Sequence, residues 1–357
     1  MADVAIVGGG VLGCALAAFL AEAGATVRLH ERDVLGAGAS GRNSGVLEHP
    51  LDATLEALYA RSLEHYAGLD GFALPPESVG CLVLGEDPGP LRAQADAVAP
   101  GFPSLRFDWL EPDDLAREEP GLAPDLHAFR MATGRPVPPA GAVRAFAERA
   151  RAAGAVLLEG SGARLARDGD RVTGVETAAG FEPAGAVVIA AGPWSGELGL
   201  PLPVTPLWGV VAQVRLAAPP RHVLEEAGTE SLVAAEPPAT RLFSLITLDG
   251  TSSLGSSFDA VEPDPGAVAH ELRARGARFV PALADAELGP LRRCARPLSP
   301  DGRPLLGPVP GVDGLHVASG HGPWGVTLGP ASAELVAAAV LDSASAIAPE
   351  LDVARVL

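Results

Sequence analysis

Short apolar runs separated by glycine and polar residues open the chain. Residues 4–7 are a β-branched run, which favours a strand buried on both faces. Residues 11–24 are mostly apolar and end in Gly24, a pattern that predicts a helix with a glycine stop. Residues 26–31 predict a second strand, which ends in Glu31. This order of elements predicts a βαβ unit.

Elements of the same kind return in the middle and at the end of the chain. Residues 140–160 predict an amphipathic helix that leads into a strand, and residues 171–198 predict a hairpin followed by a buried strand. Residues 314–340 predict a strand, a glycine-rich loop and an alanine-rich helix. The intervening segments differ in character, since residues 208–216 and 241–248 alternate as half-buried strands do.

Composition narrows the class of protein. The chain has 357 residues, enough for two modest domains, and 48% of them are hydrophobic. Its formal net charge of −18 argues against nucleic acid and anionic membranes as partners. All 26 basic residues are arginine, so a Schiff-base or general-base lysine is excluded. Cys14, Cys81 and Cys294 lie far apart, which predicts no disulfide framework and no metal site and favours a reducing, cytoplasmic location.

The glycine spacing after the first strand carries specific chemistry. Gly8 permits a tight turn, Gly10 lets backbone N–H groups approach a pyrophosphate, and Gly13 lets helix and strand pack closely. The helix N-terminus attracts the phosphates. Glu31 stands where a carboxylate accepts hydrogen bonds from a ribose and disfavours the phosphate of NADP. The unit predicts dinucleotide binding but does not separate NAD from FAD. The apolar N-terminus therefore fits a nucleotide-binding unit better than a signal peptide or a membrane span.

The loop over residues 36–50 is rich in small residues. Its free N–H groups could lie against a pyrophosphate or a flavin ring, or it could be an ordinary flexible loop.

Taken together, these segments resemble the FAD-dependent amino acid oxidase (DAO) superfamily, which includes D-amino acid, glycine and sarcosine oxidases. The segments that carry the resemblance follow one another in family order: "VAIVGGGVLG...HER", "GASGRNSG", "WLEPDDLAREEPGL", "VVIAAGPWS", "VTPLWGVVAQVRL", "SSLGSSFD", "RPLSPDGRPLLG" and "GHGPWGVTLGP". The resemblance implies bound FAD rather than diffusible NAD.

The resemblance also implies an architecture. A Rossmann-type FAD-binding domain of the glutathione-reductase-like kind is expected beside a substrate domain built on a mostly antiparallel β-sheet. The FAD-binding domain is expected to be discontinuous, over residues 1–75, 140–203 and 294–357, and the substrate domain to comprise residues 76–139 and 204–293.

Several site residues follow from the resemblance. The expected cofactor contacts, with those of the glycine motif, are Gly8, Gly10, Gly13, Glu31, Arg32, Ser40, Arg42, Asn43, Ser44, Gly45, Ala191, Gly192, Trp194, Cys294, Gly320, Gly322, Trp324 and Gly325. The motif R-P-x-x-x-D-G-x-P begins at Arg296, which is expected to hold a substrate carboxylate through two charge-assisted hydrogen bonds. Arg241 is a second candidate anchor, and Trp324 is expected to form a hydrophobic wall of the substrate site.

Other residues leave alternatives open. Cys294 stands at the spacing used for covalent FAD attachment in sarcosine oxidase-like proteins, but a buried, unmodified thiol is the more common outcome, so non-covalent FAD is favoured. His49 and His321 are candidate catalytic residues; the first could equally be solvated and the second structural. With no lysine near the flavin, the oxygen-activating route of those proteins is excluded, and the electron acceptor is oxygen or another carrier.

The expected function is oxidation of a small amino acid or N-substituted amino acid, by hydride transfer to flavin N5, to an imine that hydrolyses. A second hypothesis is oxidation of a 2-hydroxy acid, which would require a proton acceptor such as His49 or His321. A third is a nucleotide-binding module without flavin turnover. The expected partners are a small-molecule substrate and an electron acceptor, and assembly into a homo-oligomer is left open.

Overall fold

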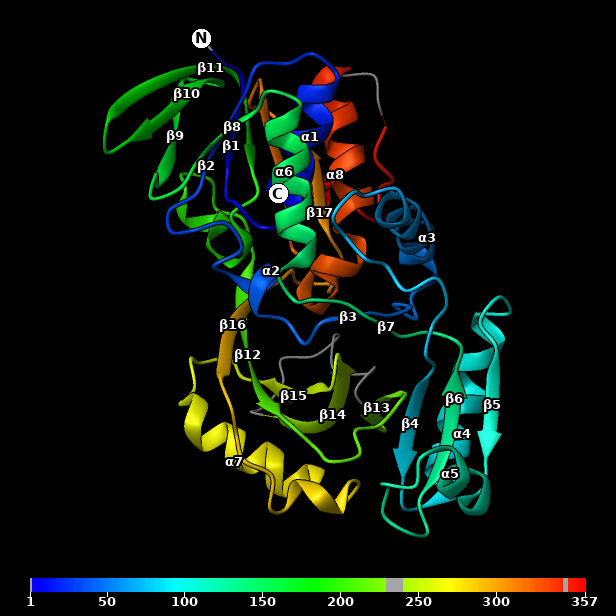
Figure 1. Ribbon diagram of the computed structural model, residues 1–357. Coiled ribbons are helices and arrows are strands. Elements are labelled where there is room, and N and C mark those ends of the chain that lie inside the picture. The colour runs from blue at the N-terminus through cyan, green and yellow to red at the C-terminus, as the bar shows by residue number, and fades with distance from the viewer. Residues whose placement is uncertain (1, 229–239, 343–345) are drawn as a thin grey trace.

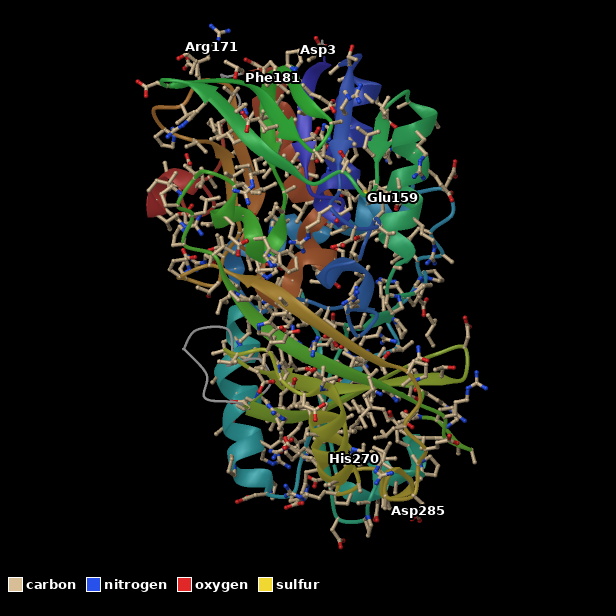
Figure 2. All side chains as sticks on the ribbon, turned by 90° about the vertical axis from the view of Figure 1, so that its left-hand side faces the viewer. Asp3, Glu159, Arg171, Phe181, His270 and Asp285 are labelled. Atoms are coloured by element: carbon tan, nitrogen blue, oxygen red, sulfur yellow. The ribbon has the colours of Figure 1, made fainter. Side chains whose placement is uncertain are left out.

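The computed structural model describes residues 2–228, 240–342 and 346–357. Within these ranges the chain forms two eight-stranded sheets and a small two-stranded one. The two large sheets lie one above the other in Figure 1, and Figure 2 shows the same halves from the side, with Asp3 and Phe181 in the first and His270 and Asp285 at the outer end of the second.

The first sheet is ordered β17-β18-β11-β1-β2-β8, and its strands from β18 to β8 are parallel while the edge strand β17 is antiparallel to β18. The antiparallel strands β10 and β9 extend from β11. In β1 the side chains of Val4 and Ile6 enter one core while those of Ala5 and Val7 enter another. The strand is thus buried on both faces, as its β-branched run predicts. The strands are β1 (Ala2–Val7), β2 (Val27–His30), β8 (Val156–Leu158), β9 (Ala163–Asp168), β10 (Arg171–Thr177), β11 (Gly180–Ile189), β17 (Leu305–Pro308) and β18 (Leu315–Ser319).

A helical layer covers one face of this sheet (Figure 1). Helix α1 packs between α6 and α8, and α3 packs on α8. The helices are α1 (Val11–Glu22), α2 (Ala39–Arg42), α3 (Ala53–Ala67), α6 (Gly141–Ala152) and α8 (Gly325–Leu341). By length and composition alone the helical segment Gly322–Leu341 could cross a membrane, but 61% of its apolar window is buried inside the fold, as in the core helix of a globular domain.

The second sheet is ordered β16-β12-β15-β14-β13-β4-β6-β5 and is antiparallel except for the β13–β4 pair. Helix α7 packs on β12, β14 and β15, while α4 packs on β4 and β6 and α5 on β6. The elements are β4 (Cys81–Gly85), α4 (Pro88–Val98), β5 (Phe107–Leu110), α5 (Pro112–Glu118), β6 (His127–Met131), β12 (Thr205–Val214), β13 (Val223–Glu226), β14 (Thr240–Leu248), β15 (Thr251–Phe258), α7 (Pro265–Gly276) and β16 (Leu291–Leu298). The two-stranded sheet joins β3 (Val46–Leu47) to β7 (Arg135–Pro136).

The expected fold class is confirmed, since a parallel sheet with a helical layer stands beside a mostly antiparallel sheet. One expected domain boundary falls inside an element. Strand β16 pairs with β12 along its whole length, from Leu298 opposite Thr205 to Leu291 opposite Ala212, so the position 294 lies within a strand of the second sheet. Continuous ladder hydrogen bonds, invisible in the local pattern, keep this strand with the second sheet.

Candidate active site

One cavity of about 1000 Å³ is lined by residues of both large sheets. Its walls include the glycine turn after β1, the loop before and after α2, strands of the second sheet, and the segment 322–327 at the start of α8. Segments far apart in the sequence therefore meet around one space large enough for a cofactor and a small substrate.

The glycine turn forms one end of the cavity. Gly8 has a φ of +112°, and a Cβ there would lie 2.4 Å from the carbonyl oxygen of Ala190. Gly10 lines the cavity and caps the N-terminus of α1 without a side chain. Gly13 does not line it, because its Cα lies against the backbone of Gly8, where a Cβ would stand 1.9 Å from the carbonyl oxygen. Gly13 thus provides close packing of helix and strand, and Gly8 and Gly10 provide the open surface.

Glu31 follows β2 and lines the same end. Its carboxylate accepts hydrogen bonds from the backbone N–H groups of Gly9, at 2.7 Å, and Asp33, at 2.8 Å. Arg32 and Trp194 also line the cavity, and the guanidinium carbon of Arg32 lies 4.5 Å from the centre of the Trp194 ring. A carboxylate, a cation and an aromatic ring therefore surround the space where a nucleoside is expected.

The small-residue loop is held in place by Asn43. The Nδ2 group of Asn43 donates hydrogen bonds to the carbonyl oxygens of Ser40, at 2.8 Å, and Pro139, at 2.9 Å. The backbone N–H of Gly45 donates to Asn43 Oδ1 at 2.8 Å. The expected cofactor contacts of this loop all line the cavity: Ser40, Arg42, Asn43, Ser44 and Gly45. The loop is an ordered wall of the site and not an arbitrary connection.

These features fit FAD. A turn free of side chains at the N-terminus of α1 suits a pyrophosphate, and Glu31 suits the ribose hydroxyls. Ala191, Gly192 and Cys294 also line the cavity, together with Gly322, Trp324 and Gly325, where a flavin ring is expected.

Arg296 lies on β16 in the wall of the cavity near the second sheet. Its Nη1 donates a hydrogen bond to the carbonyl oxygen of Ser257 at 2.9 Å, and its guanidinium carbon lies 4.7 Å from the centre of the Phe258 ring. No ion pair joins it to a carboxylate among the residues that the structure describes. Burial lowers the pKa of Arg296, yet a guanidinium keeps its proton in proteins. The side chain is thus a cation in a cavity, able to receive a carboxylate.

Cys294 also lines the cavity, two residues before Arg296 on the same strand. Its side chain is buried, and burial raises the pKa of the thiol. A thiol with a raised pKa is protonated at neutral pH and is a weak nucleophile.

The two candidate catalytic histidines differ in position. His49 lines the cavity, packs edge-on against Tyr59 and Phe102, and has a pKa lowered by burial. His321 does not line the cavity; it is fully buried, and its Nε2 lies 2.9 Å from the hydroxyl of Ser332 on α8. Burial lowers the pKa of His321 to about 4. Of the two, only His49 stands where it can meet a substrate.

Two further expected contacts lie away from the cavity. Arg241 is bound by carboxylates on two sides, with Nη1 2.8 Å from Asp259 Oδ1 and Nε 2.7 Å from Glu271 Oε2. Both ion-pair partners belong to the second sheet and α7, and Arg241 does not line the cavity, so this arginine is not placed to anchor a substrate. Gly320 has a φ of +78° and packs on Leu305, and it turns the chain without lining the cavity.

Three polar residues of the cavity wall were not expected from the sequence. Glu48, Cys81 and Glu225 all line it, and one carboxylate oxygen of each glutamate and the thiol sulfur lie within 4.8 Å of one another. They come from the segment after β3, from β4 and from β13. No local pattern links these positions, although Glu48 stands beside His49.

Comparisons with known proteins agree with this arrangement. The sequence model of the family described as FAD dependent oxidoreductase (DAO) matches residues 3–339. Glycine oxidase from Pseudomonas aeruginosa is 40% identical over 182 residues, 48% of this chain and 46% of that protein. Glycine oxidase from Geobacillus kaustophilus is 31% identical over 361 residues, 94% of this chain and 92% of that protein. The crystal structure of glycine oxidase from Geobacillus kaustophilus superposes with a TM-score of 0.83 at 27% identity, covering 99% of this chain and 98% of that one.

Proposed function

Because this chain belongs to the DAO family of FAD-dependent oxidoreductases, we propose that it oxidises the C–N bond of a small amino acid or N-substituted amino acid. The observation that carries the proposal is the guanidinium of Arg296 in the cavity wall, with no carboxylate partner among the described residues. When bound, FAD supplies the two-electron acceptor for the reaction.

The chain's own residues hold and orient the reactants. The open glycine turn at Gly8 and Gly10 and the carboxylate of Glu31 would hold the cofactor. Arg296 would fork onto the substrate carboxylate and fix the direction in which the amine-bearing carbon points. An amine that arrives unprotonated needs no protein base, and the imine product hydrolyses in water to an oxo acid and an amine or ammonia.

The nature of the flavin linkage and of the acceptor belongs to the same proposal. We expect non-covalent FAD, since burial keeps the thiol of Cys294 protonated. The electron acceptor is oxygen or another carrier, and we expect the protein to work in the cytoplasm.

Anaerobic flavin reduction tests the proposal. The visible spectrum is recorded before and after adding pooled D-amino acids with glycine and sarcosine, then a pool of 2-hydroxy acids. Bleaching by the first pool supports amine oxidation, and bleaching by the second alone replaces it with hydroxy acid oxidation. A purified protein without flavin, or a flavin that neither pool reduces, favours a binding module. Readmission of air, with and without an artificial dye, then identifies the acceptor.

Two arginine variants test the anchor. Arg296→Ala is expected to raise the KM for the amino acid at least tenfold, about the value of one charge-assisted hydrogen bond. Arg303→Ala is the matched control, because Arg303 belongs to the same motif but pairs with Asp52 and does not line the cavity. An unchanged KM in Arg296→Ala would refute the anchor role.

A further inference from the structure

Charged side chains of both signs line the cavity. Arg296 brings a guanidinium on one side, and Glu48 and Glu225 bring carboxylates on another, next to Cys81. The two glutamates line the same cavity as the guanidinium of Arg296, which has no carboxylate partner among the described residues. A ligand that contacts both Arg296 and the two glutamates would complement them with one negative and one positive end.

Strand register gives the separation of the two ends. The side chain of Arg296 crosses β12 at Gly209 and reaches the carbonyl oxygen of Ser257 on β15. Glu225 on β13 is opposite Ser244 on β14, and Ser244 is opposite Gly255 on β15. Two strand spacings, about 10 Å across the sheet, separate the acidic side chain from β15, and Ser257 lies two residues, about 7 Å, along that strand from Gly255. The side chain of Glu225 extends into this span. A ligand that bridges Arg296 and Glu225 therefore needs an aliphatic chain between its two charged groups.

The surface between the two ends suits such a chain. Ile246 and Phe258 line the cavity from β14 and β15, and Met131 lines it from β6. Ser244 and Ser256 also line it, and their hydroxyls lie 3.0 Å apart and share one hydrogen bond. Methylene groups can lie on the apolar side chains of Met131, Ile246 and Phe258.

The spacing of the acidic group suits an organic cation. An ammonium that donates tetrahedral hydrogen bonds of about 2.9 Å places its acceptors about 4.7 Å apart. One oxygen of Glu48, one oxygen of Glu225 and the sulfur of Cys81 lie no more than 4.8 Å apart, so one ammonium can reach all three.

We infer that the cavity selects amino acids whose side chain ends in a cation, with Arg296 at the carboxylate and Glu48 and Glu225 at the distal ammonium or guanidinium. This inference rests on the proposed function and names its substrate class. It assigns Glu48 and Glu225 to specificity, apart from the binding of the cofactor and the oxidised carbon.

Isosteric substrate pairs test the inference. Lysine is compared with norleucine, and ornithine with norvaline, in both D and L forms, by the rate of anaerobic flavin reduction. We expect kcat/KM to favour the cationic member at least tenfold. Glu225→Gln and Glu48→Gln are each expected to lower this ratio at least tenfold through lysine alone, while norleucine is unaffected. Glu86→Gln is the control, since Glu86 is exposed just after β4 and pairs with Arg278.

A binding measurement separates this inference from the proposed function. The probe is ε-aminocaproate, which has both charged ends but no amine beside its carboxylate, and it is compared with caproate. We expect ε-aminocaproate to raise the thermal unfolding midpoint more than caproate does, and Glu225→Gln to abolish the difference.

Equal effects of the two probes on the unfolding midpoint, or equal flavin reduction by lysine and norleucine, would overturn the inference and leave amino acid oxidation standing. Selective binding of ε-aminocaproate with no reduction by any amino acid would support the cation site and refute the oxidation. A stoichiometric divalent metal that Glu225→Gln loses would assign the acidic group to that metal and overturn the inference.

Discussion

The guanidinium of Arg296 lies directly against the backbone of Gly209 on the neighbouring strand. A Cβ at Gly209 would stand 2.5 Å from Nη1 and 2.6 Å from Cζ of Arg296. The missing side chain lets the arginine cross β12 and reach Ser257 on β15. The position of the proposed carboxylate anchor therefore depends on a glycine that is distant in sequence.

Gly209→Ala should displace this anchor without unfolding the protein. The new methyl group meets the guanidinium, and the arginine must turn away from Ser257. We expect the KM for the substrate to rise about tenfold, the equivalent of one charge-assisted hydrogen bond, with little change in flavin content. Gly121→Ala is the control, since its nearest neighbour would be 3.8 Å away. An unaltered KM would show that the anchor does not need this path.

Alanine substitutions at two glycines of the N-terminal turn should have different effects on stability and flavin content. Gly13→Ala places a Cβ 1.9 Å from the carbonyl oxygen of Gly8, and backbone cannot yield, so we expect a lower unfolding midpoint together with loss of flavin. Gly10→Ala meets only the hydroxyl of Ser40, at 3.0 Å, but covers the open surface at the start of α1. We expect this variant to fold normally and to lose flavin. The ratio of flavin to protein absorbance and thermal unfolding of each variant distinguish these outcomes, and a flavin-replete Gly10→Ala would argue against the pyrophosphate position.

The sequence was informative where the chemistry is local. The glycine turn and Glu31 lie within one βαβ unit, and Arg296 lies in a contiguous motif, so their places in the cavity wall could be predicted. The sequence does not show which residues from distant segments form ion pairs or pair as strands. Arg241 looked like an anchor because nothing local shows that Asp259 and Glu271 would take its charge.

The same limit applies to burial and to the acidic group. His321 is flanked by glycines, as an exposed loop residue would be, yet its ring is buried against Ser332, about two turns into α8. Glu225 comes near Cys81 because β13 pairs with β4 in parallel, and pairing between strands so far apart in the chain leaves no local signal in the sequence.

Arg241 should prove structural. Removing it leaves Asp259, which is 5% exposed, without its ion-pair partner, and we expect Arg241→Ala to lower the free energy of unfolding by about 3 kcal/mol. The double variant Arg241→Ala/Asp259→Asn removes the stranded charge, so it should recover most of that loss and keep the substrate KM within about twofold of the wild type. Denaturant unfolding and steady-state kinetics measure both quantities. A large rise in KM that persists in the double variant would restore Arg241 as an anchor.

The flavin should leave the denatured protein freely. Because burial raises the pKa of Cys294, its thiol stays protonated and does not attack the ring at neutral pH. Acid precipitation is expected to release all the flavin into the supernatant, and Cys294→Ala should retain a full complement of cofactor before precipitation. Flavin that stays in the pellet of the wild type and is released only from Cys294→Ala would establish a covalent bond instead.

His321 should make the protein less stable in acid. Burial lowers its pKa from the ordinary value of 6.5 to about 4, so between these two pH values the unfolded chain binds a proton that the native protein does not. Stability is therefore full above pH 6.5 and falls as the pH drops towards 4, by about 3 kcal/mol for this residue. His30, His49 and His316 also have pKa values lowered by burial and add effects of the same sign, so the contribution of His321 is obtained by difference.

We expect His321→Asn to lessen the loss of unfolding free energy between pH 7.5 and pH 5, whereas His270→Asn, a change at an exposed residue of α7, should not. Denaturant unfolding at the two pH values measures this, and an identical loss in wild type and His321→Asn would mean that His321 is protonated in the native state.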